Sequence, residues 1–154
     1  VRPYPISIEW PSRWLAGAPP VAQCRADLVA QLGLSPDALI GVGVDRLDYT
    51  KGIPERITAI ERLLARRPDL VERFVFVQIG VPSRSSLESY AAVEHEIERT
   101  VETLNTKHAV PGGAPLVVLS TSALDAFSLT ALYRLAQRPA AWDPSITPPD
   151  TVLF

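Results

Sequence analysis

Three apolar segments, each followed by a polar turn and then by a helical pattern, most constrain the fold of this chain. The apolar runs are continuous, which is typical of strands buried on both faces, and they lie at 40–44, 74–79 and 116–119. Helical spacing follows each run, at 54–66, 86–107 and 125–136. Strands that alternate with helices form a parallel sheet with right-handed crossovers, so we predict an α/β fold. Three strands make about half of a doubly wound sheet.

Apolar residues at three-to-four spacing predict which face of each helix is buried. One further helix is expected before the first strand, at 21–32, ended by Gly33. Pro54 suits the first turn of its helix because its missing N–H would have no partner there, and Asp125 is expected to cap the last helix. The expected inward residues are Val21, Cys24, Leu28, Val29 and Leu32; then Ile53, Ile57, Ile60 and Leu63 or Leu64; then Tyr90, Val93, Ile97, Val101 and Leu104.

Residues 42–56, Val-Gly-Val-Asp-Arg-Leu-Asp-Tyr-Thr-Lys-Gly-Ile-Pro-Glu-Arg, join the first buried strand to its helix. In open α/β sheets ligands bind beyond the carboxyl ends of the strands, and there Arg46 and Lys51 offer two cations. Both side chains can reach phosphate oxygens, and the backbone N–H groups near Gly52 and Ile53 add the donors of a helix N-terminus. The stretch therefore predicts an anion site, for phosphate or diphosphate first.

A second interpretation of the same stretch needs no ligand. In it, Arg46 pairs with Asp45 or Asp48, and Lys51 is solvated. The glycines here do not make a dinucleotide-binding fingerprint, because Arg46 stands where the third glycine belongs.

The second strand also ends beside a cation, Arg84, which precedes a helix. Adjacent strand ends lie about 5 Å apart, so Arg84 and Arg46 can face one cleft and hold two phosphates, one on each substrate. A surface arginine placed there by chance is the alternative.

Composition excludes several classes of function. A net charge of −2 gives no overall attraction to nucleic acid or to anionic membranes, and no apolar run approaches the roughly 20 residues of a membrane span. Cys24, the single cysteine, cannot form an internal disulfide and is expected to pack in the core, which fits a reducing, cytoplasmic location. His95 and His108 have no second ligand at metal spacing, so we predict no metal site, and we expect His95 to face solvent.

Three segments together resemble the trehalose-6-phosphate synthases, retaining glycosyltransferases of family 20 with the GT-B fold. These are Tyr4-Pro-Ile-Ser-Ile-Glu-Trp10, the run 42–56 and Phe74-Val-Phe-Val-Gln-Ile-Gly-Val-Pro-Ser-Arg84. The resemblance covers 4–107 well and 116–136 loosely. It implies a Rossmann-like parallel sheet with flanking helices, about half of the C-terminal, donor-binding domain of such an enzyme.

The resemblance also implies roles for single residues. The family's arginine and lysine at Arg46 and Lys51 hold the donor's diphosphate, and its arginine at Arg84 contacts the phosphate of glucose 6-phosphate. Leu124 matches a residue whose main chain contacts the nucleotide base region. The implied substrates are UDP-glucose or another NDP-glucose and glucose 6-phosphate, without a metal or a further cofactor. No catalytic residue is assigned within the chain, since the family's catalytic histidine would precede residue 1.

The resemblance divides the chain into three parts. Residues 1–20 would end the N-terminal domain and link it to the next, with a short strand at 4–10. Residues 21–137 would be a partial nucleotide-sugar-binding domain, and 138–154 is a divergent proline-rich tail. Because the chain contains no methionine and the run that the family has next is replaced near 137, we expect a piece of a longer protein, ended by a frameshift or truncation. Resequencing the gene would test this.

Two alternatives to the synthase remain open. One is a related glucosyltransferase with another phosphorylated acceptor, as in glucosylglycerol-phosphate synthases. The other is a non-catalytic remnant, which would associate into oligomers through the exposed edge of half a sheet.

Overall fold

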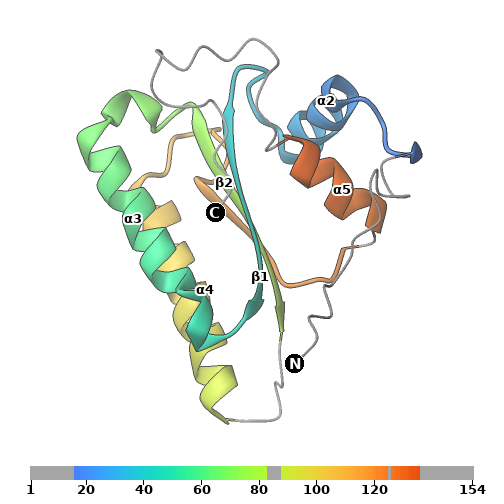
Figure 1. The fold of residues 1–154 in the computed structure, drawn as a ribbon. Helices are drawn as coiled ribbons and strands as arrows, with labels where there is room; N and C mark the ends of the chain where they lie inside the picture. The colour runs from blue at the N-terminus through green and yellow to red at the C-terminus, as the bar shows by residue number, and fades with distance from the viewer. Residues whose placement is uncertain (1–15, 83–87, 125, 136–154) are drawn as a thin grey trace, which may run out of the picture.

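The computed structural model describes residues 16–82, 88–124 and 126–135 of the chain. Within them, a three-stranded parallel sheet lies between two pairs of helices (Figure 1). In chain order the elements are α2 (Val21–Leu32), β1 (Leu39–Leu47), the 3₁₀ helix η1 (Tyr49–Lys51), α3 (Ile53–Arg66), the 3₁₀ helix η2 (Pro68–Leu70), β2 (Phe74–Pro82), α4 (Glu88–Lys107), β3 (Val117–Ser120) and α5 (Ala126–Leu135). Figure 1 shows α3 and α4 on one face of the sheet and α2 and α5 on the other.

The sheet has the order β1-β2-β3, and both neighbouring pairs are parallel, which confirms the predicted α/β fold. β1 continues three residues beyond the end of its apolar run at Val44. Asp45, Arg46 and Leu47 continue the ladder opposite Gly80, Val81 and Pro82 of β2. Backbone pairing extends the strand here although the side chains turn polar, so the two charged residues sit on a strand and not in a loop.

Each face of the sheet has its own core, as the alternation of side chains along a strand requires. Odd-numbered residues of β1 and even-numbered residues of β2 face α3 and α4, where Leu47 and Phe76 are buried with Ile57 and Ile97. The opposite residues face α2 and α5, where the buried cluster comprises Cys24, Leu34, Ala38, Ile40, Val42, Val75, Val77, Ile79, Leu132 and Leu135. Polar groups that lie in these layers therefore need partners within the protein.

The predicted helix faces are mostly correct. Cys24 is buried in the α2/α5 core as a free thiol, and Leu64, not its neighbour Leu63, completes the inward stripe of α3. Val21 was expected to face inward, but 39% of it is exposed because it lies in the first turn of α2, where little packs over it. The side chain of Tyr90 lies outside the described set, whereas Ile97, Val101 and Leu104 of α4 are buried as predicted.

The side chain of Asn105 on α4 acts as a partner for the backbone of β3. Its Nδ2 donates to the carbonyl of Val117 at 2.8 Å, and its Oδ1 accepts from the N–H of the same residue, also at 2.8 Å. These two hydrogen bonds imitate those of a neighbouring strand. They fix α4 to β3 where the strand begins.

Several predictions fall on residues outside the described ranges: the strand at 4–10, the turn containing Arg84, the cap at Asp125 and the tail at 138–154. Among the described helices, none combines the length and the apolar character needed to cross a membrane.

Candidate anion-binding site

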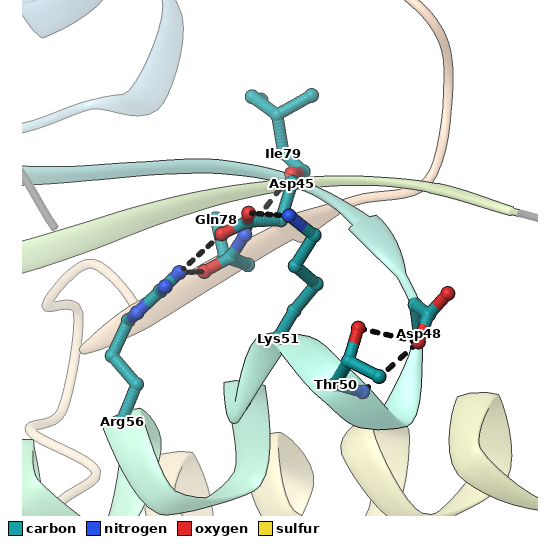
Figure 2. A network of polar contacts seen from close by, with 7 residues as sticks. All are labelled: Asp45, Asp48, Thr50, Lys51, Arg56, Gln78 and Ile79. Carbon is teal, nitrogen blue, oxygen red and sulfur yellow. Dashed lines mark hydrogen bonds and ion pairs between the residues drawn. The ribbon is translucent and has the colours of Figure 1, made fainter.

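One aspartate, Asp48 (Figure 2), and one glycine, Gly52, shape the turn between β1 and α3. Asp48 follows the strand and caps η1: its Oδ1 accepts the backbone N–H and the hydroxyl of Thr50, each at 2.9 Å. Gly52 then takes a left-handed conformation with φ 60°, which glycine adopts without the steric cost of a Cβ. α3 begins at the next residue, with Pro54 in its first turn as predicted.

Asp48 is kept ionised by its surroundings. The N–H and then the hydroxyl of Thr50 lower its pKa below the ordinary carboxyl value, while burial works in the opposite direction. The positive charges of Arg46 and Lys51 lower the pKa of Asp48 further. Both cations predicted to bind an anion thus lie at the carboxyl end of β1, Arg46 within the strand and Lys51 at the end of η1.

The two cations approach the strand end from different sides. Arg46 is exposed, and in the part of the chain that the structure describes its side chain forms no hydrogen bond or ion pair. It belongs to the even-numbered residues of β1, which face the α2/α5 layer. Lys51 ends η1 on the α3 side; 39% of its side chain is exposed, and its Nζ lies 3.8 Å from Oδ1 of Asp45.

The alternative in which Arg46 pairs with Asp45 or Asp48 is therefore wrong, because the Arg46 side chain forms an ion pair with neither of them. Asp45 instead meets Arg56 of α3, whose Nη1 donates to Oδ2 of Asp45 at 2.9 Å and to Oε1 of Gln78 at 2.9 Å. Figure 2 shows Arg56 and Lys51 approaching Asp45 from neighbouring turns of the chain. Lys51 is partly exposed to solvent and also forms a long, weak ion pair with Asp45.

Sequence reasoning missed the polar cluster formed by Asp45, Arg56 and Gln78. One signal was present: Gln78 interrupts an otherwise apolar strand, and a buried amide needs polar partners. A second signal was Gly43, since a Cβ there would lie 2.5 Å from Oε1 of Gln78 and 2.9 Å from Nη1 of Arg56. The glycine thus serves to accommodate this cluster against the sheet.

The first turn of α3 adds backbone donors to the site. The first helical hydrogen bond runs from the N–H of Arg56 to the carbonyl of Gly52 at 3.0 Å, and no described side chain caps the helix. The N–H groups of Ile53 and Glu55 therefore have no helical partner. A helix N-terminus of this kind attracts anions, which agrees with the charge of the two side chains nearby.

Leu124 lies away from this turn, against the α2/α5 core. It helps to line a cavity of about 350 Å³ between α2 and α5, together with Leu28, Ile79, Ser120 and Leu132. The cavity reaches Ile79 and Ser120, which pair near the carboxyl ends of β2 and β3. Leu124 thus borders a hollow that opens along the same sheet.

The histidines lie elsewhere, on α4 and just after it. His95 is exposed as predicted, with its Nδ1 3.4 Å from Glu98, whereas Nε2 of His108 is buried without a hydrogen-bond partner among the described residues. Over the same residues, no three His, Cys, Asp or Glu side chains gather as metal ligands would.

Comparison with known proteins identifies close similarity to one family. The profile of glycosyltransferase family 20 matches residues 1–140. An alpha,alpha-trehalose-phosphate synthase [UDP-forming] A of Dictyostelium discoideum is 40% identical over 62% of this chain, which corresponds to 13% of that protein.

Solved structures agree with this match. A trehalose-6-phosphate structure from E. coli bound with UDP-2-fluoro glucose has a TM-score of 0.67 and 29% identity, over 80% of this chain and 26% of that one. An alpha,alpha-trehalose-phosphate synthase (UDP-forming) from Burkholderia xenovorans in complex with glucose-6-phosphate has a TM-score of 0.65 and 26% identity, over 75% and 27%. The chain thus spans 13% to 27% of the length of these three proteins.

Proposed function

The chain belongs to glycosyltransferase family 20, and on this premise we propose that it is part of the donor-binding half of a trehalose-phosphate synthase with the GT-B fold. The intact protein would transfer glucose from UDP-glucose, or another NDP-glucose, to glucose 6-phosphate with retention of anomeric configuration. Similarity to proteins solved with UDP-2-fluoro glucose and with glucose-6-phosphate supports both substrates. The buried free thiol of Cys24 fits the cytoplasmic location that we propose with it.

The observation that carries this proposal is the pair of cations at the carboxyl end of β1. Arg46 and Lys51 would hold the donor's diphosphate, with the open N–H groups of α3 as further donors. As the glucosyl bond breaks, negative charge grows on the departing diphosphate, and positive groups already in place stabilise that charge in the transition state. The nucleotide sugar is a substrate, and we propose no further cofactor.

The remaining site residues keep the roles that the family resemblance gives them. Arg84 would bind the acceptor phosphate. The main chain of Leu124 would lie by the nucleotide base, and the hollow that Leu124 borders between α2 and α5 supports this placement.

Titration of UDP into the purified chain, followed by calorimetry, tests the donor site. We expect wild type to bind UDP and the double variant Arg46→Ala/Lys51→Ala to bind about tenfold or more weakly, with a smaller dependence on salt. Arg62→Ala/Arg66→Ala is the matched control, since it removes the same charge from exposed positions farther along α3. Equal affinities in all three proteins, or no binding by wild type, would contradict the proposal.

Synthase activity is a separate measurement. We expect no trehalose 6-phosphate from the isolated 154-residue chain, because positioning of both substrates needs the two facing domains that the family's fold implies. Formation of trehalose 6-phosphate by this polypeptide alone would refute the claim that both domains are needed. An oligomer on size exclusion that ignores UDP-glucose would favour the non-catalytic alternative.

A further inference from the structure

Arg56 lies at the centre of the polar cluster behind the proposed diphosphate site. One of its nitrogens, Nη1, donates both to Asp45 on β1 and to Gln78 on β2, each at 2.9 Å. Only 16% of the Arg56 side chain and 16% of the Asp45 side chain are exposed. The pair is thus shielded from water and from salt, and its charges act more strongly than those of a surface pair.

Gln78 fixes the direction in which the Arg56 side chain points. It is fully buried, and its Nε2 donates to the carbonyl of Ile79 at 3.0 Å. The amide oxygen is therefore turned toward Arg56. Gly43 leaves the space in which these atoms meet, since a Cβ would lie within 3 Å of both.

Asp45 lies between two cations but is bonded to only one of them. Its Oδ2 accepts from Arg56, while its Oδ1 is 3.8 Å from Nζ of Lys51, too far for a hydrogen bond. The three groups together carry a net charge of +1. Because Arg56 already compensates Asp45, the positive charge of Lys51 is not cancelled, and its three N–H donors are not committed to Asp45.

We propose that Arg56 is a positioning residue for the donor diphosphate: by holding Asp45 it keeps the Lys51 ammonium free to bind phosphate oxygens. The inference rests on the proposed function, in which Lys51 contacts the diphosphate. Without Arg56, the half-buried carboxylate of Asp45 would draw Lys51 into a direct hydrogen bond. The net charge of Asp45, Arg56 and Lys51 together would then fall from +1 to zero. Loss of Arg56 would thus weaken diphosphate binding although Arg56 itself does not contact the diphosphate.

A purely structural role for Arg56 makes a different prediction. If Arg56 only ties α3 to the sheet, its loss weakens UDP binding through displacement of the turn, and removal of the Asp45 charge cannot restore the affinity. If Arg56 acts through charge, removal of the Asp45 carboxylate restores the affinity, because nothing is left to capture Lys51.

UDP affinity of five variants separates these cases. We expect Arg56→Gln to weaken binding about tenfold, Asp45→Asn to bind at least as well as wild type, and Asp45→Asn/Arg56→Gln to recover most of the loss. In a Lys51→Ala background, Arg56→Gln should cause no further loss. An unrestored double variant, an unchanged Arg56→Gln or a weakened Asp45→Asn would each overturn the proposal. If Arg56→Gln does not fold, the UDP affinity of Asp45→Asn tests the proposal by itself. Binding at least as tight as that of wild type would support it, and weaker binding would overturn it.

A measurement without ligand distinguishes failure of this inference from failure of the proposed function. Crystal structures of wild type and Arg56→Gln should show Nζ of Lys51 moving from 3.8 Å to hydrogen-bonding distance of the Asp45 carboxylate. If wild type does not bind UDP but Lys51 moves, the donor-site assignment is wrong and the charge arrangement stands. If Lys51 keeps its position in the variant, the charge arrangement is wrong whatever UDP does.

Discussion

The substitution Gly43→Ala tests whether the polar cluster is packed as tightly as the structure indicates. A Cβ at this position would lie 2.5 Å from Oε1 of Gln78, 2.9 Å from Nη1 of Arg56 and 2.9 Å from Cζ of Phe76. Each separation is shorter than real Cβ contacts tolerate. All three neighbours lie on the α3/α4 side of the sheet, toward which the added methyl group would point. The methyl group therefore fits only if the neighbouring side chains or the strands shift.

The expected cost follows from the two ways in which the clash can be relieved. If Phe76 and the strands shift, overpacking of a dense core costs about 1–3 kcal/mol. If the Arg56–Gln78 contact opens instead, a hydrogen bond to a charged group is lost, worth about 1.5–3 kcal/mol. Taken together, the two routes lead us to expect a loss of about 1–3 kcal/mol in the free energy of unfolding.

Urea denaturation followed by circular dichroism measures this loss as a lower midpoint at an unchanged slope. Gly33→Ala is the control for a glycine change without crowding, since Gly33 has φ 62° and no atom lies within 4 Å of the position that a Cβ would take there. Strain alone should cost that variant about 1–2 kcal/mol. A loss below about 0.5 kcal/mol for Gly43→Ala would refute the packing argument, because three simultaneous close contacts cannot be that cheap to relieve.

Three further predictions concern other parts of the fold. Asn105→Ala leaves the buried N–H and carbonyl of Val117 without partners and should cost about 2–3 kcal/mol in urea denaturation, whereas wild-type stability would show that water replaces the side chain. Leu64→Ala should cost about 2–5 kcal/mol and Leu63→Ala under about 0.5, because only Leu64 is buried; similar losses would contradict the assigned helix face. The pKa of Asp48 is lowered in the fold, so its ionised form contributes stability above the ordinary carboxyl pKa, and this contribution is lost as the pH falls through the lowered value. Asp48→Ala should therefore be less stable than wild type at pH 7, with the difference shrinking in acid; a constant difference from pH 7 to pH 2 would contradict the assignment.

The order of strands and helices was predictable because each apolar run and each helical stripe is a local pattern. The runs at 40–44 and 74–79 became β1 and β2, and the stripe from Ile53 to Leu64 became the buried face of α3. Strand lengths were less predictable, since Asp45 and Arg46 join the ladder through their backbones and give no apolar signal. Val21 was misplaced because helical periodicity does not tell how far the neighbouring layer extends over a first turn.

The candidate site was predictable only in part. The two cations could be located because a strand end followed by a helix start is a local arrangement, and both Arg46 and Lys51 lie there. The polar cluster behind them could not be predicted, because Arg56 and Gln78 come from a helix and a second strand and meet Asp45 only in the folded chain. The role of Arg84 stays a prediction, since that residue lies outside the described ranges.

The adjacent residues Asp45 and Arg46 illustrate how a strand separates opposite charges. In the sequence they sum to zero, yet pleating directs the carboxylate toward α3 and the guanidinium toward the other layer. The acid is compensated internally, and the base projects its field into solvent. A protein that is slightly acidic as a whole can therefore present a locally electropositive edge, which no sum along the polypeptide would reveal.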